Sequence, residues 1–397
     1  MRRENDHSIT IMKRILVIGT VIALAVAVFF LQRFMSRTDV PQVTSLPSDG
    51  GLPYRLPEGF EITVSFKELS EPRVIVFDSH GRMLVSESSS GRIVIPGKGV
   101  LLENLDHPHG LAFYTDPTSK QVYLYVAEVR EVSRYPYNTE TGTIQSTQRK
   151  NIMNLPEGGR HTTRTIGFGK DFRTQPIVAG LPQGNFLAPI KLYTSIGSSC
   201  DVCLEDSWKY AAILESDPEG TYAAEVAGGL RDVEFFTFHP TTGMLWASEQ
   251  SRADFPDEIN IIGPTLKYGW PYCYGGQKRD ESFTQKSDRT DLPMDCVQTE
   301  PPEIELPSHA APLGIAFIPE NWPAPWAGRL LVAVNDTIRW FDVDETGHVR
   351  SSGDFVTGFL VNGKIFGRPV DLKFGPDGAL YISDDTAGVI YKISSTS

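Results

Sequence analysis

One pattern recurs six times in this chain of 397 residues and limits the folds that it can adopt. Each copy is an apolar strand with alternating polarity, a turn that usually contains glycine, and a second apolar strand that ends in a small residue and an acid. The copies lie at 74–87, 110–128, 165–201, 235–249, 314–336 and 370–385. Short strands repeated every few tens of residues are typical of solenoids and propellers, whose units bury their faces only by packing against one another. We therefore predict an all-β protein, a six-bladed β-propeller over residues 56–397.

An apolar run from Ile15 to Leu31 precedes these repeats. It has no polar face, and its length matches the roughly 17–25 residues that a membrane-spanning helix needs. Basic residues precede the run, and the bulky stretch after Phe29 lacks the small residues of a signal-peptidase site. We expect a single-pass transmembrane anchor at 15–32, a cytoplasmic N-terminus at 1–14 and a tether at 33–55, with a cleaved signal peptide as the alternative. In a bacterium, this topology predicts an inner-membrane protein whose propeller lies in the periplasm.

The net charge of −12 and the cysteine content exclude some functions and favour others. An acidic chain with no basic run beyond its N-terminus is not expected to bind nucleic acid. An even number of cysteines in an exported protein favours disulfides. We expect neighbours to pair, Cys200 with Cys203 and Cys273 with Cys296, although four cysteines allow three connectivities. Zinc binding by the Cys-x-x-Cys is the alternative, but the sequence has no second such pair.

The segment 158–206 contains the strongest candidate for a functional site. A glycine-rich loop carries His161, between Arg160 and Arg164, to the start of an apolar strand. Histidine suits proton transfer near neutral pH, and guanidinium groups suit anions. Taken alone, His161 fits a capping or surface position better than a catalytic one. In a propeller, however, the segments that flank the inner strands converge at one channel mouth, and here they are 106–109, 160–164, 231–232, 250–258 and 367–369.

Several motifs together resemble the glucose/sorbosone dehydrogenase family, and most closely its sorbosone-dehydrogenase-like branch. The likeness covers nearly all of 56–393. It implies a six-bladed propeller that uses pyrroloquinoline quinone (PQQ) and calcium to oxidise a CH–OH group of a sugar or a sorbosone-like aldehyde. A respiratory electron acceptor would then reoxidise the cofactor. The motifs are Leu56-Pro57-Glu58-Gly59-Phe60, Gly158-Gly159-x-His161-x-x-Arg164, Gly197-Ser198-Ser199-Cys200-x-x-Cys203, Gly229-Leu230-Arg231, Tyr268-Gly269-Trp270-Pro271 and Gly367-Arg368-Pro369.

The resemblance also implies roles for individual residues. His161 is expected to be the general base and Arg231 to assist it. Cofactor contacts are expected from His161, Arg164, Arg231, Asp232 and Arg368. Calcium is expected near the backbone of Ser251 and Arg252, with Asp257 and Glu258 as oxygen ligands.

The sequence departs from the family pattern at Asp232 and Ser251, and also at two cofactor contacts of the glucose-oxidising branch: a Gln is missing at Leu105-Asp106-His107, and a Lys is replaced near Asn335-Asp336. Asp232 stands where the family has Asn, and Ser251 stands where a glycine of the calcium loop is expected. A carboxylate would repel an anionic quinone unless it met calcium or held a proton. Two alternative functions therefore stay open: a calcium-dependent propeller lactonase or other hydrolase, and a non-catalytic binding propeller that has lost the quinone. Both enzyme hypotheses require His161, Arg231 and Arg368 to converge in the channel.

Overall fold

The computed structural model describes residues 43–45, 53–171, 177–178, 181–182, 189–252, 254–286, 295–344 and 347–396. The expected anchor at 15–32 lies outside these residues. Across the described part of the chain, no helix has the length and apolar character that crossing a membrane requires.

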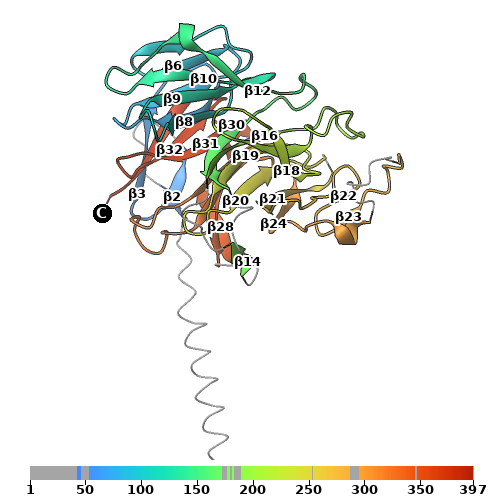
Figure 1. The fold of residues 1–397 in the computed structure, drawn as a ribbon. Coiled ribbons are helices and arrows are strands. Elements are labelled where there is room, and N and C mark those ends of the chain that lie inside the picture. The colour runs from blue at the N-terminus through green and yellow to red at the C-terminus, as the bar shows by residue number, and fades with distance from the viewer. Residues whose placement is uncertain are drawn as a thin grey trace, which may run out of the picture. The chain divides into compact units, whose positions relative to one another are not determined.

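The described strands form six antiparallel blades (Figure 1). From the innermost strand outward, blade 1 is β4 (Pro72–Phe77), β5 (Met83–Glu87), β6 (Arg92–Ile95) and β7 (Gly99–Leu102). Blade 2 is β8 (Leu111–Thr115), β9 (Val122–Ala127) and β10 (Glu131–Asn138), and β10 also pairs with β11 (Thr143–Ile144) and β12 (Lys150–Asn154). Blade 3 is β13 (Ile166–Lys170), β16 (Ile190–Ile196), β17 (Ala212–Ser216) and β18 (Ala224–Gly228).

Blades 4 to 6 repeat the same order. Blade 4 is β19 (Val233–Phe238), β20 (Leu245–Glu249), β21 (Pro256–Ile262) and β24 (Ile304–Ser308). Blade 5 is β25 (Pro312–Phe317), β26 (Leu330–Val334), β27 (Thr337–Val343) and β28 (Val349–Val356). Blade 6 is β31 (Pro369–Phe374), β32 (Leu380–Asp384), β33 (Val389–Ser395) and β3 (Phe60–Phe66). Four hairpins lie outside the blades: β1 (Val43–Ser45) with β2 (Arg55–Pro57), β14 (Ile177–Val178) with β15 (Leu181–Pro182), β22 (Cys273–Tyr274) with β23 (Lys278–Arg279), and β29 (Leu360–Val361) with β30 (Lys364–Ile365).

The blades close into a ring. Each innermost strand contacts the innermost strands of its two neighbours, in the order β4, β8, β13, β19, β25, β31 and back to β4. Blade 6 takes its outermost strand from the start of the propeller, because β3 pairs with β33 (Figure 1, blue beside red). The predicted six-bladed all-β propeller is confirmed, and each repeated unit supplies the two innermost strands of one blade.

Packing between blades explains why the second strands read as continuous apolar runs. In β5, β20, β26 and β32 every residue is buried. Both faces of such a strand meet a neighbouring blade, so neither face needs polar side chains. The outermost strands β3 and β28 are only partly buried and carry more polar side chains.

Serine hydroxyls join blades near the channel. The Ser248 hydroxyl of blade 4 donates to the Leu313 carbonyl of blade 5 at 2.6 Å. The Ser383 hydroxyl of blade 6 donates to the Arg73 carbonyl of blade 1, also at 2.6 Å. The innermost strands have no sheet partner on their channel side, so buried backbone groups there need such bonds.

We expect Ser383→Ala to destabilise the ring by about 1–3 kcal/mol, because the buried Arg73 carbonyl loses its donor. Ser216→Ala is the matched control, since the Ser216 hydroxyl is buried in blade 3 without a hydrogen-bond partner. Chemical denaturation of the two variants measures the difference. Equal shifts of the unfolding midpoint would show that the inter-blade bond contributes nothing.

Candidate functional site

One end of the propeller channel opens into a cavity of about 440 Å³. This volume suits a small organic ligand. Loops of four blades contribute to it, and all of them either precede an innermost strand or follow a second strand. The lining residues are Glu71, Arg73, Ser88, Ser89, His107, His109, Thr162, Thr163, Arg368, Asp385 and Thr386.

A chain of ion pairs crosses the channel beside this cavity. Arg368 donates two hydrogen bonds to the Asp385 carboxylate, at 2.9 and 2.5 Å. Arg73 donates to the same carboxylate at 2.8 Å and lies 3.4 Å from a carboxylate oxygen of Glu234. Burial would raise the pKa of Asp385, but the hydrogen bonds and charges of the two arginines lower it below its ordinary value. Because Arg73 is in blade 1 and Glu234 in blade 4, the chain joins opposite sides of the ring.

Sequence reasoning did not identify Arg73, Glu234 or Asp385 as site residues. The available signal was a charged residue within an otherwise apolar innermost strand, as at Arg73 of β4 and Glu234 of β19. Such a residue faces the channel or must be paired, because an unpaired buried charge is costly.

His161 is held at the channel mouth by the chain that follows β16. Its Nδ1 atom lies 2.8 Å from the Ser198 hydroxyl and 3.1 Å from the Ser198 carbonyl oxygen. A carbonyl oxygen can only accept a hydrogen bond, so Nδ1 carries the proton of the neutral ring and Nε2 carries the lone pair. Burial, and then the positive charge of Arg231, lower the pKa of His161 to about 4. At neutral pH the ring therefore has an unprotonated nitrogen that can accept a proton.

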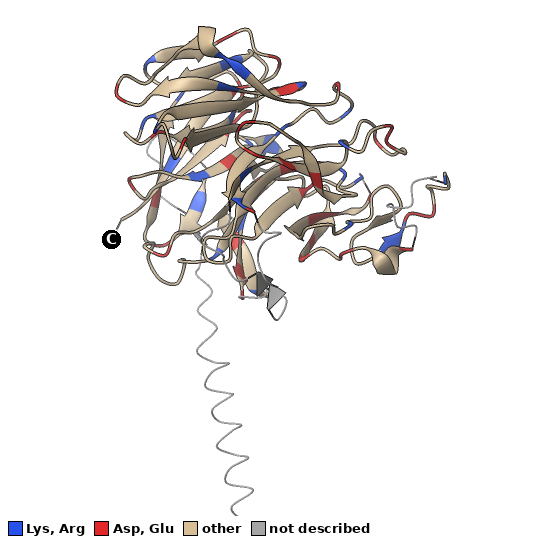
Figure 2. Ribbon diagram, in the orientation of Figure 1, with Lys and Arg blue, Asp and Glu red and all other residues tan. Residues whose placement is uncertain are grey.

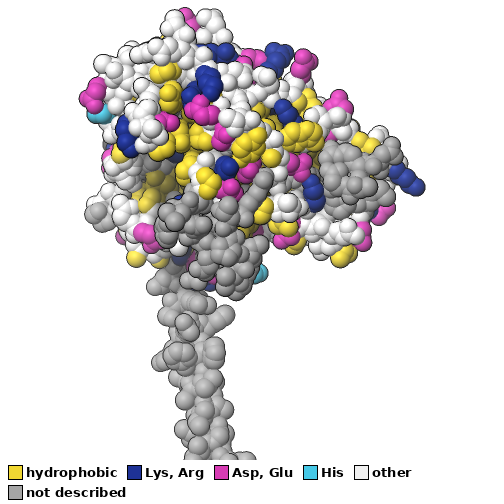
Figure 3. Space-filling view, viewed as in Figure 1, with side chains coloured by type: hydrophobic (Ala, Val, Ile, Leu, Met, Phe, Trp, Pro, Cys, Tyr) yellow, Lys and Arg dark blue, Asp and Glu magenta, His cyan; other side chains and the backbone are white. Residues whose placement is uncertain are grey.

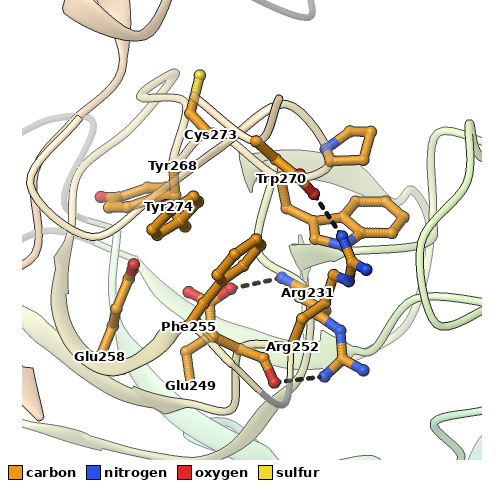
Figure 4. Close-up of a pocket in the computed structure, with 12 residues that line it drawn as sticks. Arg231, Glu249, Arg252, Phe255, Glu258, Tyr268, Trp270, Cys273 and Tyr274 are labelled. Atoms are coloured by element: carbon orange, nitrogen blue, oxygen red, sulfur yellow. Dashed lines mark hydrogen bonds and ion pairs between the residues drawn. The ribbon is translucent and has the colours of Figure 1, made fainter. Parts of the chain in front are cut away.

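The guanidinium of Arg231 is occupied by hydrogen bonds to other residues of the chain. Its guanidinium donates to the Asp201 carbonyl and carboxylate at 3.1 and 2.8 Å. It also donates to the carbonyls of Gln250 and Ser251 at 3.1 and 3.0 Å. Arg231 lines a separate pocket of only about 20 Å³, together with Glu249 and Trp270 (Figure 4). In this arrangement it fixes the loops around His161, and its donors do not face the larger cavity.

Arg164 differs from its expected role as a cofactor contact. Its residue is 0% exposed and lies beneath the loop that it follows. The guanidinium donates to the carbonyls of Val129, His161 and Thr163 at 3.2, 2.9 and 2.9 Å. Burial lowers the pKa of Arg164 to about 10. Its position supports the backbone of the His161 loop.

Asp232 faces His161 rather than the cavity. One of its carboxylate oxygens lies 3.7 Å from His161 Nε2. The other, Oδ1, is buried without a hydrogen-bond partner. Burial, and then the negative charge of Glu234, raise the pKa of Asp232 well above its ordinary value.

The oxygens expected to bind calcium are already hydrogen-bonded to N–H groups. The Ser251 carbonyl accepts from Arg231 at 3.0 Å, and the Arg252 carbonyl accepts from the Phe255 amide at 2.8 Å. The Asp257 carboxylate accepts from the amides of Ser251 and Ala311, each at 2.8 Å.

Glu258 is engaged in the same way. It accepts from the Gly275 amide at 2.5 Å and from the Asn260 side chain at 3.1 Å. The Arg252 side chain meanwhile pairs with Asp280 at 2.5 Å. As arranged, the four residues Ser251, Arg252, Asp257 and Glu258 do not fit a calcium ion, since a cation would meet N–H donors and a guanidinium. The sequence shows the oxygens but not the donors that reach them from distant loops.

Both expected disulfides are confirmed. Cys200 pairs with Cys203 and Cys273 with Cys296. Among the described residues, one grouping of His, Cys, Asp and Glu could hold a metal: Cys200, Cys203 and Glu205. Its two cysteines are oxidised and have no thiolate to offer zinc. The Cys200–Cys203 turn instead presents Asp201 to Arg231.

The structure brings some of the candidate residues close together. Arg368 lines the cavity with Thr162 and Thr163, which follow His161 directly. His161 contacts Asp232, and Asp232 follows Arg231 in the chain. Of the three residues that both enzyme hypotheses require to converge, Arg368 lines this cavity and Arg231 lines the separate pocket, while His161 lies close enough to Arg231 that this charge, after burial, lowers the pKa of the His161 ring.

Charges of both signs are mixed over the propeller. Basic and acidic residues are scattered over the ribbon (Figure 2), and on the face shown in Figure 3 they are interspersed with apolar and uncharged side chains. On the described residues of this face we see no continuous basic surface of the kind that binds nucleic acid.

Comparisons with known proteins agree with this architecture. Residues 54–335 match the model of the TrAA12-like family. A pyrroloquinoline quinone-dependent sugar dehydrogenase of Hypocrea jecorina is 24% identical over 306 residues, which is 66% of this chain and 69% of the relative.

Two solved structures share the fold. One is the Trichoderma reesei enzyme of Carbohydrate-Active Enzymes Family AA12, with a TM-score of 0.66 and 20% identity over 89% of this chain and 100% of that one. The other is the holo PQQ domain of a Coprinopsis cinerea pyranose dehydrogenase, with a TM-score of 0.65 and 18% identity over 88% and 98%. The chain thus belongs to the TrAA12-like family, and its expected kinship with PQQ-dependent sugar dehydrogenases is confirmed.

Proposed function

We propose that this protein oxidises a CH–OH group of a sugar or aldose with PQQ bound at the channel mouth. The observation that carries the proposal is the 440 Å³ cavity, into which Arg73 and Arg368 project from blades 1 and 6. Family membership and relatives that are named as PQQ-dependent support the same cofactor.

The cavity residues fit an anionic cofactor of this kind. PQQ carries carboxylates, and a guanidinium binds a carboxylate in bidentate fashion. The Arg368 side chain is 49% exposed, so it can reach a ligand while it keeps its contact with Asp385. His109 adds a buried ring nitrogen, Nε2, that has no hydrogen-bond partner in the protein. Such an unpaired buried group gains free energy when a ligand supplies a partner.

When bound, the quinone would supply the two-electron redox chemistry that protein side chains lack. The chain would supply binding and proton transfer. Arg73 and Arg368 would hold the cofactor carboxylates, and His161 would accept the substrate hydroxyl proton at Nε2. Arg231 would position His161 through the shared loop and would lower the pKa of its ring. A low pKa keeps the His161 ring unprotonated over a wide range of pH, but it also makes the ring a weaker proton acceptor.

We include no calcium in this proposal, because the four expected ligand residues hold N–H donors. A calcium-dependent lactonase would need the same oxygens, so these contacts give it no support. A quinone-free binding propeller remains as an outcome of the experiments below.

We further propose that the protein is a single-pass bacterial inner-membrane protein with a periplasmic propeller, which passes electrons to a respiratory acceptor. The support is the apolar run from Ile15 to Leu31 and the two disulfides, which favour an oxidising compartment.

The test of function uses the full chain, purified in detergent and incubated with PQQ. We expect a change in the absorbance of bound quinone on adding an aldose, and reduction of a dye acceptor. Arg368→Ala should weaken PQQ binding roughly tenfold or more, because a charged hydrogen-bonded pair is lost. Arg350→Ala, at the edge of blade 5, is the matched control. Absence of PQQ binding, or equal binding by both variants, would contradict the proposed cofactor site.

A second prediction concerns the pH dependence of stability. Burial raises the pKa of Glu258 from its ordinary value to about 7. When the pKa of a carboxyl group is higher in the folded than in the unfolded state, the group contributes its full stabilisation at pH values below its unfolded-state pKa. This stabilisation is lost as the pH rises through the folded-state pKa. Between about pH 4.5 and 7 the thermal midpoint should therefore fall, and in Glu258→Gln it should fall less.

The same melts test the calcium site. With a chelator and with millimolar calcium, the difference between wild type and Glu258→Gln should stay the same. A calcium-induced rise in the midpoint that the substitution abolishes would show that Glu258 binds the ion. An identical pH dependence of the two proteins would contradict the raised pKa.

A further inference from the structure

The Cys200–Cys203 disulfide closes a tight turn between β16 and β17 of blade 3. Its two cysteines are 3 positions apart in the sequence, whereas Cys273 and Cys296 are 23 apart. The stabilisation that a disulfide gains by restricting the unfolded chain grows with the length of the loop that it closes. The short-range disulfide therefore contributes less to global stability, and its main effect is on the local shape of its turn.

The segment just before this turn holds one wall of the cavity. The Arg160 amide, in the loop 158–163, donates to the Ser199 carbonyl at 2.8 Å. Thr162 and Thr163 follow in the same loop and line the cavity. The position of this wall therefore depends on the position of Ser199.

Ser199 is held in turn by residues on both sides of the disulfide. Its amide and its hydroxyl donate to the Glu205 carboxylate at 2.8 and 2.5 Å. The Ser198 hydroxyl, one residue earlier, donates to the Cys200 carbonyl at 2.8 Å. Because the disulfide fixes Cys200 next to Cys203, it keeps Glu205 close to Ser199 and closes the loop that contains these partners.

Asp201, inside the turn, fixes a second part of the site. Its carbonyl and carboxylate accept hydrogen bonds from the Arg231 guanidinium, which also donates to two carbonyls of the loop after β20. The Ser198 amide donates to the Arg231 carbonyl at 2.7 Å. One short turn thus connects the loop 158–163, which leads into blade 3, with two loops of blade 4.

The Cys200–Cys203 disulfide is also the more accessible of the two. Both of its cysteines are half-buried, and the Asp201 side chain between them is 51% exposed. Cys273 and Cys296 are only 5% and 7% exposed. Thiol–disulfide exchange requires a thiolate to attack a sulfur atom directly, so an external dithiol should reach the turn first.

We propose that the Cys200–Cys203 disulfide positions the cavity wall and Arg231, and that its reduction by an external dithiol weakens ligand binding while the propeller stays folded. The part that concerns the ligand rests on the proposed function. In the reduction, a thiolate of the dithiol attacks one cysteine sulfur and the Cys200–Cys203 bond breaks. The second thiolate of the reagent then displaces that cysteine, so the reagent ends as a cyclic disulfide, and two electrons and two protons pass to the protein as two thiols.

The positioning role is tested first without cofactor. The full chain in detergent is treated with a limiting amount of dithiol, desalted and alkylated, and mass spectrometry locates the modified cysteines. We expect modification at Cys200 and Cys203 first. Amide hydrogen exchange in 158–163 should then be roughly tenfold faster or more, while exchange in the fully buried strand β26 stays unchanged. Equal modification of all four cysteines, or unchanged exchange in 158–163, would overturn the proposal.

Two variants and a reoxidised sample separate loss of the bond from the bulk of the alkylating group. The double variant Cys200→Ser with Cys203→Ser should show the same faster exchange and no further response to dithiol. Asp206→Ala, at an exposed position of the same loop, is the matched control and should behave as wild type. Reduced wild type that is desalted and reoxidised should recover slow exchange. Thermal melts verify that each form is folded, and slow exchange in the folded double variant would contradict the positioning role.

PQQ binding then separates this inference from the proposed function. Dithiols reduce quinones, so PQQ is added only after the reagent has been removed. We expect the PQQ affinity of the alkylated chain and of the double variant to be roughly tenfold lower than that of wild type, because a less ordered wall costs more entropy to fix. Equal affinity in all forms would reject the effect on the ligand and leave the proposed function intact. Faster exchange without PQQ binding by any form would retain the positioning role and reject the proposed function.

Discussion

Closure of the ring is the constraint on which the rest of the structure depends. Each blade buries its two faces against the two neighbouring blades. A ring with one incomplete blade would therefore expose an apolar face and an unpaired sheet edge to water. Here the gap is filled by β3, which crosses from the start of the propeller to pair with β33 at its end. Because the closing strand comes from the other end of the sequence, this pairing joins the first and last parts of the propeller and keeps the six inner strands in one ring. The loops that build the site therefore start from fixed positions.

Buried charge is concentrated where those loops meet. Arg73, Asp385 and Glu234 come from three different blades and satisfy one another across the channel. A network of this kind adds little stability, because desolvation of each ion offsets most of the attraction. It does discriminate strongly against displaced arrangements, since moving one member leaves another charge buried and unpaired. The network can thus define the shape of the cavity more than it stabilises the propeller.

The sequence was sufficient to predict the repeated parts of the molecule. In units such as 235–249 and 370–385 the sequence predicts two apolar strands joined by a glycine turn. In the structure, each of these units forms the two innermost strands of one blade. Cys273 and Cys296 were paired correctly because few partners exist for them. What could not be predicted were contacts between units. Arg164 looked like an anion ligand by type and spacing, but its guanidinium donates to the carbonyls of its own loop, at His161 and Thr163, and to the distant Val129 carbonyl of blade 2. Asp257 looked like a calcium ligand, but each of its carboxylate oxygens already accepts from an amide, one at Ser251 in the preceding segment and one at Ala311 of blade 5.

The contact of Arg73 with Glu234 across the channel affects how a ligand enters and leaves the cavity. Side chains from opposite walls meet there, so this ion pair narrows the bore of the propeller at that depth. A molecule that arrives at the mouth has to depart through the same opening. Substrate and product would then use the same opening in turn.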